Sequence, residues 1–409
     1  MSVEEALATH LEDIGKNNAD GDPFLVADLA HFRRQQRRWS KHMPRVHPYY
    51  AVKCNSALPV LRALAECGVN FDCASKEELR LVLSIGTRPD QIVFSHPAKD
   101  TSHIRYAIEN GVTLMTFDNV DELRKIHAVS RDARLLLRIL PDDSKSLYKH
   151  GIKFGVKLED VPCLLKTARE LSLSIVGVSF HVGGGSTSID AFADAVRLAR
   201  RVFDLAERSG HHDMSILDIG GGFPGSDVTL MPFESIAASF QTALNECFPP
   251  ESGVRLIAEP GRFYAESALT LAVKVVSRRE VMRPAVSAST DSRNTEAGCN
   301  ADGAVAQRRT FKYYVNEGLH NSFHLVAVKL ATATPRLLSL GGHIWGPTCN
   351  PNDWMNQQCM LPELQVGDWL RYDRMGAYSA CTSSHFNGFL PSRIIYCRAF
   401  EVRAVRFSG

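Results

Sequence analysis

Short apolar runs alternate with segments in which apolar residues recur at helical spacing through most of the chain. After a polar, helix-prone segment over residues 1–22, runs with strand character lie at residues 24–27, 48–53, 69–72, 92–94, 112–117, 135–139, 175–180, 215–219 and 255–259. Nearly continuous apolar strands separated by helical segments are typical of a parallel sheet that is buried on both faces. About eight such units fit between residues 25 and 268, which is the size of a closed (β/α)8 barrel.

The pattern changes after residue 268. Residues 269–276 resemble a strand, whereas residues 278–310 are polar and poor in large apolar side chains. We interpret that second stretch as a long mobile loop. From Phe311 to the end, short apolar runs broken by Gly and Pro predict an antiparallel β-domain. The sequence therefore predicts an α/β chain, with a barrel over residues 25–268 and a β-domain made of residues 1–24 and 269–409.

Composition limits the classes of function. The net charge is +2, which gives no electrostatic indication of a nucleic-acid partner. No apolar run approaches the roughly 20 residues of a membrane span, and the polar N-terminus does not resemble a signal peptide. The ten cysteines are scattered without zinc-type pairs, so we expect reduced thiols, a cytoplasmic protein and no metal site.

Polar or glycine residues lie at the ends of the predicted strands, which face the active site in a (β/α)8 barrel. They are Lys53, Asp72, Arg138, His181, Gly220, Gly221, Gly222, Glu259 and Arg262. Each has a structural explanation when taken singly, such as a helix cap, a satisfied core histidine or a salt-bridge partner. Their occurrence at so many strand ends at once favours a shared functional site.

The residue types at these strand ends favour one cofactor. A lysine at the end of a buried strand can form a Schiff base with a carbonyl cofactor. The glycine run exposes backbone amides to an anion, and the Arg262 guanidinium can bind the same phosphate. Glu259 would keep a pyridine nitrogen protonated, and His181 could stack on the ring. The set suggests pyridoxal phosphate.

Several motifs resemble those of the eukaryotic ornithine decarboxylases. They lie, in order, at residues 48–55, 71–75, 179–183, 217–225, 258–262, 345–349, 366–369 and 375–378. The resemblance implies an alanine-racemase-type barrel that binds pyridoxal 5'-phosphate, followed by a β-domain. It also implies a head-to-tail homodimer with two active sites at the interface.

The resemblance also assigns roles to residues. It implies that Lys53 carries the cofactor beside Asp72, with His181 on the ring and Glu259 at the pyridine nitrogen. The phosphate would be held by the glycine run together with Gly261, Arg262 and Tyr378, and Arg138 would complete the cofactor site. Cys349 would reach the site from the partner subunit and control reprotonation after carbon dioxide leaves.

The substrate side departs from the family pattern. Ornithine decarboxylases carry a diamine-binding aspartate directly after the cysteine, where this chain has Asn350. A second such aspartate aligns, without gaps, with Lys329, and the residue before it is Val328. No Asp or Glu occurs from Gly318 to Asn352. With Phe386 as a further pocket residue, these changes predict a neutral, apolar amino-acid substrate, with leucine the best single expectation.

Two alternatives remain open from the sequence. The protein could be an ornithine decarboxylase in which another acid binds the distal amine. It could also be a non-catalytic relative, like the antizyme inhibitors, which bind the regulator antizyme. The intact cofactor motifs favour altered specificity over lost catalysis, and antizyme binding stays open.

Overall fold

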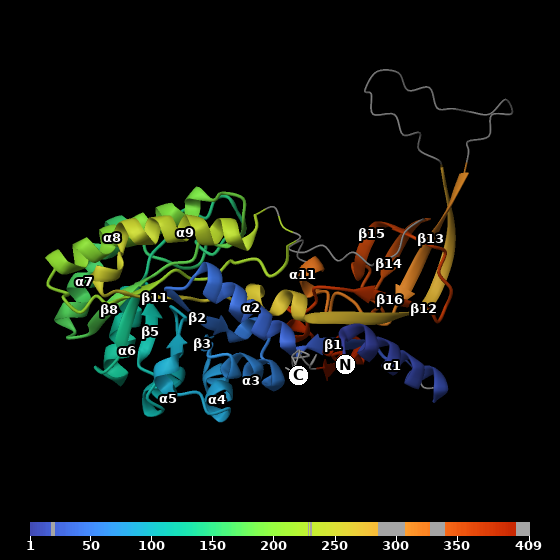
Figure 1. The fold of residues 1–409 in the computed structure, drawn as a ribbon, viewed down its shortest axis with the longest axis horizontal. Helices are drawn as coiled ribbons and strands as arrows, with labels where there is room; N and C mark the ends of the chain where they lie inside the picture. Colours follow the sequence, from blue (N-terminus) through green and yellow to red (C-terminus); the bar gives the residue numbers. More distant parts are fainter. Residues whose placement is uncertain (18–20, 228, 230, 285–306, 328–339, 398–409) are drawn as a thin grey trace, which may run out of the picture.

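The computed structural model describes residues 1–17, 21–227, 229, 231–284, 307–327 and 340–397. A closed barrel of eight parallel strands lies beside a second, seven-stranded sheet (Figure 1). This architecture confirms the predicted fold class. The second sheet is mixed, because two of its strand pairs are parallel.

The barrel strands follow the order β10–β11–β2–β3–β4–β5–β6–β8 around the closed sheet. Their bounds are β2 (Val46–Ala51), β3 (Asn70–Cys73), β4 (Ile92–Phe94), β5 (Leu114–Phe117), β6 (Arg134–Arg138), β8 (Ser174–Ser179), β10 (Ile216–Asp218) and β11 (Arg255–Ala258). A short antiparallel pair, β7 (Ser146–Tyr148) and β9 (Gly184–Ser186), lies outside the barrel.

Helices cover the outside of the barrel (Figure 1). They are α2 (Leu29–His42), α3 (Leu58–Glu66), α4 (Lys76–Ser84), α5 (Thr101–Glu109), α6 (Val120–Val129), α7 (Val161–Glu170), α8 (Asp190–Arg208) and α9 (Phe233–Cys247), and the short α10 (Arg262–Ala265) follows β11. Several begin at a side-chain cap, as where the Ser75 side chain accepts a hydrogen bond from the Glu78 amide. Such caps satisfy amides that have no partner within the helix.

Side chains alternate between two environments along each barrel strand, because successive residues of a strand point to opposite faces. One set meets the helices. The other set points inward and forms a separate apolar layer inside the barrel: Tyr49, Val93, Leu114, Leu136, Val176, Ile216 and Ile257. All are buried, so this level of the barrel is a packed core.

The second sheet has the order β15–β14–β13–β12–β1–β17, and β16 also pairs with β12. Its strands are β1 (Phe24–Asp28), β12 (Leu269–Pro284), β13 (Gln307–Val315), β14 (Leu340–Trp345), β15 (Trp354–Leu361), β16 (Trp369–Tyr372) and β17 (Arg393–Cys397). Helix α1 (Val3–Lys16) packs beside β1, and α11 (His324–Ala327) follows β13. Because β1 pairs with β12 and β17, the first strand belongs to this sheet, and the barrel strands begin later than the predicted residue 25.

The prediction of a mobile loop over residues 278–310 was wrong at both ends of that stretch. Strand β12 runs to Pro284 and β13 begins at Gln307, and the two form a long antiparallel hairpin that extends from the sheet (Figure 1). An ion pair of 2.7 Å joins Glu280 to Arg309 across the hairpin. These polar residues belong to a solvent-exposed ladder, which is why their composition resembles that of a loop. Residues 285–306 lie outside the described part of the chain.

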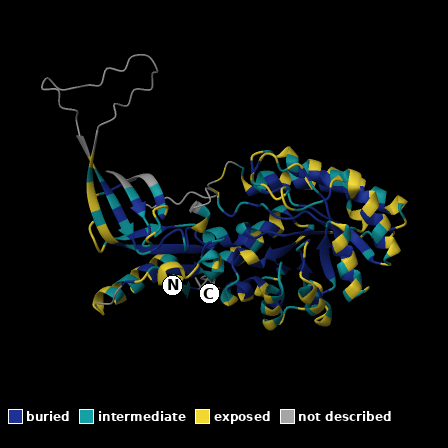
Figure 2. Ribbon diagram, turned by 180° about the vertical axis from the view of Figure 1, so that it is seen from behind, coloured by how far each residue is buried: buried dark blue, intermediate teal, exposed yellow. Residues whose placement is uncertain are grey.

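A continuous core joins the two parts. Ribbon segments coloured as buried run from the barrel into the second sheet (Figure 2). One apolar cluster contains Phe71 of the barrel together with Leu25, Val273 and Tyr313 of the sheet. No helix in the described residues is both long and apolar enough to span a bilayer.

Trp39 offers a test of how the outer helices hold the barrel. Its side chain is 1% exposed and packs against Phe223, Phe233 and Phe263. Its indole N–H donates to the Val46 carbonyl oxygen at 2.8 Å. We expect Trp39→Ala to lower the free energy of unfolding by about 3–5 kcal/mol, because it leaves a cavity and an unpaired carbonyl.

Urea denaturation followed by circular dichroism measures this loss. Trp39→Phe keeps most of the packing, so its loss should be smaller. Val366→Ala is the control, since Val366 is 59% exposed and its truncation should change stability by less than about 0.5 kcal/mol. Equal losses for all three variants would contradict this account.

Candidate active site

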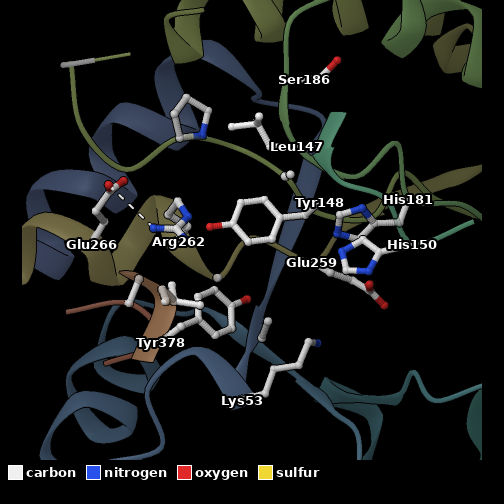
Figure 3. A pocket seen from close by; sticks show the side chains of 18 of the residues that line it. Lys53, Leu147, Tyr148, His150, His181, Ser186, Glu259, Arg262, Glu266 and Tyr378 are labelled. Atoms are coloured by element: carbon white, nitrogen blue, oxygen red, sulfur yellow. Dashed lines mark ion pairs between the residues drawn. The ribbon is translucent and has the colours of Figure 1, made fainter. Parts of the chain in front are cut away.

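A pocket of about 750 Å³ lies at the carboxyl ends of the barrel strands, where the barrel meets the second sheet (Figure 3). Its lining includes six of the predicted strand-end residues: Lys53, Arg138, His181, Gly222, Glu259 and Arg262. It also includes Gly261 and Tyr378, to which the family resemblance gave a role. Tyr378 comes from the segment after β16, so both parts of the chain build the pocket. The structure thus brings together side chains that are far apart in sequence.

A polar layer lies directly above the apolar layer of the barrel. Two residues beyond Val93, Leu114, Leu136, Ile216 and Ile257 come Ser95, Thr116, Arg138, Asp218 and Glu259, all of them buried. A spacing of two keeps a side chain on the same face of its strand. The same inward-facing positions that carry apolar side chains inside the barrel therefore carry ionisable side chains one level higher, at the floor of the pocket.

Lys53 and Asp72 form an ion pair in this layer. The Lys53 ammonium lies 2.6 Å from Asp72 Oδ2, and Asp72 is fully buried while the Lys53 side chain is 45% exposed. Burial lowers the pKa of Lys53, but the charges of Asp72, Tyr378 and Glu259 outweigh it, so the net shift is upward. Lys53 is thus protonated in the structure as it stands, with its nitrogen facing the pocket (Figure 3).

Glu259 sits in the same layer, two residues beyond the apolar Ile257. Burial raises its pKa and the charge of Asp72 raises it further, while Lys53 and Arg138 act in the opposite direction. A carboxylate so placed can pair with a cationic ring nitrogen, which would relieve the cost of its burial.

His181 lies over the pocket with a defined proton position. Its Nδ1 accepts a hydrogen bond of 2.9 Å from the Gly183 amide, so Nε2 carries the proton in the neutral ring. Burial lowers its pKa well below the ordinary value, and His150, Arg138 and Lys53 lower it further. A neutral imidazole of this kind presents a flat face for stacking.

The glycine run brings backbone amides close to the pocket. Gly220 and Gly222 have positive φ values of 67° and 94°. A Cβ at Gly222 would lie 2.2 Å from the Gly183 carbonyl oxygen, so no side chain fits there. The Arg262 guanidinium lies 5.5 Å from the centre of the Tyr378 ring, and its Nη1 lies 3.7 Å from Glu266 Oε1. Bare amides, an arginine and a tyrosine together suit a phosphate group.

The predicted substrate residues lie elsewhere. Cys349 is exposed and does not line this pocket, and its backbone amide donates to Asn387 Oδ1. Asn350 lines a second cavity of about 520 Å³ on the second sheet. Phe386 is 45% exposed and stacks on His320 with ring centres 4.2 Å apart. Val328 and Lys329 lie outside the described residues.

Among the pocket residues that the sequence analysis did not identify, three lie close to the predicted groups. Tyr148 and His150 reach the pocket from the segment after β6, and His150 meets the His181 ring edge-on at 4.5 Å (Figure 3). That segment has no regular apolar period, so nothing in its pattern marked these side chains. Ser95, whose side chain lowers the pKa of Glu259, could have been found as the polar residue after the apolar strand β4.

Comparison with known proteins identifies this arrangement. Residues 29–266 match the family model described as the pyridoxal binding domain of pyridoxal-dependent decarboxylases. The chain belongs to this family of pyridoxal-phosphate-dependent decarboxylases, as the motifs indicated.

Relatives extend the match to nearly the whole chain. The chain is 42% identical to ornithine decarboxylase of Mus musculus over 404 residues, which is 97% of this chain and 85% of that protein. It is 43% identical to antizyme inhibitor 2 of Xenopus laevis over 385 residues, 92% of this chain and 81% of that protein. Among solved structures, arginine decarboxylase of Paramecium bursaria Chlorella virus is 30% identical with a TM-score of 0.83, covering 95% of this chain and 100% of that one.

The residues present fit the cofactor. Gly222, Arg262 and Tyr378 all line the pocket, and Gly222 has no side chain that would cover its backbone amide. Lys53 supplies an amine to the pocket, and Glu259 supplies a carboxylate beside it. When bound, pyridoxal phosphate supplies the electron sink for the bond that breaks as carbon dioxide leaves.

The chain's own groups would then do the remaining work. Lys53 would have to lose the proton that Asp72 stabilises before its nitrogen could bind the cofactor covalently. Neutral His181 would cover a ring face without adding charge. Glu259 would favour a protonated ring nitrogen, which strengthens electron withdrawal. Arg262 and the glycine amides would hold the phosphate and so keep the reacting atoms in one orientation.

Substitution of Lys53 tests its assignment as the residue that binds the cofactor covalently. We expect Lys53→Ala to abolish the visible absorption band of the bound cofactor and nearly all turnover, because no other amine replaces its covalent link. Spectra of the purified protein before and after borohydride treatment measure the link. Lys99→Ala is the control lysine, since Lys99 pairs with Glu122 at 2.7 Å and does not line the pocket. Retention of the band and of activity in Lys53→Ala would refute the assignment.

Proposed function

We propose that this protein decarboxylates a basic L-amino acid, with ornithine the first candidate, and releases carbon dioxide and the corresponding diamine. The observation that carries the proposal is the 42% identity to ornithine decarboxylase over 97% of the chain. The structural similarity to an arginine decarboxylase supports the same class of substrate. These relatives favour ornithine, the alternative weighed above, over leucine.

A basic substrate needs an acceptor for its distal charge, and two carboxylates line the pocket besides Glu259. Glu266 lies 3.7 Å from the Arg262 guanidinium. Asp373 lies on the side of the second sheet and accepts a hydrogen bond of 2.7 Å from Arg371 Nε. Arg262 is also the residue expected to bind the phosphate, whereas Arg371 does not line the pocket, so Asp373 is the better candidate for an acid that replaces the missing family aspartate.

The contacts of Asn350 favour a second candidate, a neutral apolar amino acid such as leucine. Asn350 Oδ1 accepts a hydrogen bond of 2.9 Å from the backbone N–H of Asn352, which fixes the orientation of the Asn350 side-chain amide. Its Nδ2 therefore faces His320 Nε2, at 2.8 Å. An ammonium group approaching Asn350 would meet amide hydrogens instead of an acceptor. Leaving a buried charge unpaired costs about 3–5 kcal/mol, or roughly 10²- to 10³-fold in rate.

Values of kcat/KM decide between the two substrate classes. We expect ornithine, lysine or arginine to exceed leucine, valine, methionine and phenylalanine on one enzyme preparation. Asn350→Asp should then raise kcat/KM for ornithine relative to leucine by about 10- to 100-fold, because a carboxylate replaces an amide donor. Asn352→Asp adds the same charge to the same loop at an exposed position and is the control. A wild-type preference for leucine would reject the first proposal and support the second.

We also propose that the active protein is a homodimer in which Cys349 enters the pocket of the partner subunit. The thiol is exposed and lies outside the pocket of its own chain, which supports a role across an interface. Symmetric dimers allow each subunit to supply one group to the other's site.

Mixing two inactive variants tests this arrangement. Lys53→Ala and Cys349→Ala, combined in equal amounts and allowed to exchange subunits, should regain about one quarter of wild-type activity. Half of the dimers are then mixed, and each mixed dimer has one site with both groups intact. Exchange is verified with differently tagged subunits. No recovery despite exchange would argue for a site built within one chain.

Antizyme binding is a further proposal, which the 43% identity to an antizyme inhibitor supports. It concerns a surface and not the pocket, so it is compatible with either substrate class. Pull-down with purified antizyme tests it independently of activity, and absence of binding at micromolar concentrations would reject it.

A further inference from the structure

The polar layer below the pocket holds more carboxyl groups than cations. Asp72, Asp218 and Glu259 are all buried there, and Asp218 and Asp72 are completely inaccessible. Lys53 and Arg138 are the cations that act on Glu259. Three ionised carboxylates facing two cations would leave one buried negative charge without compensation, which is costly in a low-dielectric interior. One proton on the layer removes this imbalance.

Of the three carboxyl groups, Asp218 has the fewest interactions that would stabilise its ionised form. Its Oδ1 accepts a single hydrogen bond of 2.9 Å, from the Gly220 amide. Its Oδ2 is buried, and no donor within the described residues reaches it. The other two carboxyl groups are better placed, because Asp72 pairs with Lys53 at 2.6 Å and Glu259 has Lys53, Arg138 and Ser95 acting to lower its pKa.

Asp218 and Glu259 lie close together on adjacent strands. Strand β10 pairs with β11, with Asp218 opposite Ile257, two residues before Glu259. Two ionised carboxylates are both acceptors and cannot share a hydrogen bond. Since no donor among the described residues reaches Asp218 Oδ2, a proton on this atom would give it the one hydrogen bond that it lacks, with Glu259 as the acceptor.

Electrostatics indicate which of the two carries the proton. Burial raises the pKa of Asp218 well above its usual range, and the charges of Glu259 and Asp72 raise it further. The Gly220 amide alone opposes this shift. For Glu259, Lys53, Arg138 and Ser95 all lower the pKa against the effect of burial and of Asp72. The proton therefore belongs on Asp218.

We propose that Asp218 is a neutral carboxylic acid whose Oδ2–H donates a hydrogen bond to Glu259 and keeps Glu259 ionised and oriented toward the pocket. Asp218 is then a positioning residue that acts through Glu259, since it does not line the pocket itself. Its Oδ1, left as the carbonyl oxygen, is the atom that the Gly220 amide binds. The same carboxyl group thus joins the glycine run to Glu259.

The variant Asp218→Asn imitates a neutral acid. Its amide oxygen can accept from Gly220 and its Nδ2 can donate to Glu259. We expect this variant to bind pyridoxal phosphate with unchanged affinity and an unchanged visible spectrum at neutral pH. Asp218→Ala removes the donor and should weaken cofactor binding by tenfold or more. Asp72→Asn is the matched control, because it neutralises the partner of Lys53 and should weaken cofactor binding despite its similar shape.

The pH dependence of stability without cofactor gives an independent readout. The unfolded chain loses the Asp218 proton above about pH 4, whereas the folded protein keeps it, so wild-type stability falls as pH rises through this window. Asp218→Asn has no such proton to take up. Its folding equilibrium constant, divided by that of the wild type, should therefore increase with pH by up to about tenfold per pH unit.

The opposite results would overturn the proposal. An Asp218→Asn protein that loses cofactor affinity, or whose relative stability falls as pH rises, would mean that Asp218 is ionised in the native state. If the variant does not fold, infrared spectra of wild-type protein with isotope-labelled aspartate decide the question. A protonated-carboxyl band at neutral pH that shifts with the label supports the proposal, and its absence refutes it.

Discussion

The neutralisation of buried charge is the constraint on which this site depends. A closed barrel turns one face of every strand inward, and at the level of the pocket that face carries ionisable side chains instead of apolar ones. Because these side chains are buried, water does not solvate their charges, and each charge needs a partner inside the barrel. The ion pair of Lys53 with Asp72 meets this requirement for two of them. The geometry of the pocket floor is therefore decided largely by charge balance, and the apolar layer beneath it supplies the rigid support.

The second sheet completes what the barrel begins. The Tyr378 backbone amide donates to the Cys54 carbonyl oxygen at 2.9 Å, one residue after Lys53. The Asn55 side chain donates to the Gly376 carbonyl oxygen at 3.0 Å. These contacts fix the segment after β16 against the end of β2 and its following turn, η1 (Val52–Cys54). The cofactor side of the pocket is consequently a property of the whole chain, although most of its residues come from the barrel.

Much of this arrangement could be predicted from the sequence, for physical reasons. The barrel strands are apolar runs of regular spacing, and functional groups at strand ends meet at one edge, so Lys53, His181 and Glu259 were identifiable. Strand β1 was assigned to the barrel because its true neighbours, such as Arg393 opposite Phe24, are remote in sequence. The β12–β13 hairpin was mistaken for a loop at its ends because exposed strands carry polar side chains. No sequence pattern indicated His150, because it lies in an irregular connection outside the helices and strands.

The position of β1 has a consequence for how the chain forms during synthesis. Strand β1 precedes all eight barrel strands in the chain, whereas its partners β12 and β17 both follow them. The barrel strands can pair with one another as soon as they emerge from the ribosome. Strand β1 has no partner until β12 has been made, and its other edge stays unpaired until β17 follows. Such long-range pairing is slow, so an apolar strand with unpaired backbone groups is exposed to other chains while the barrel forms.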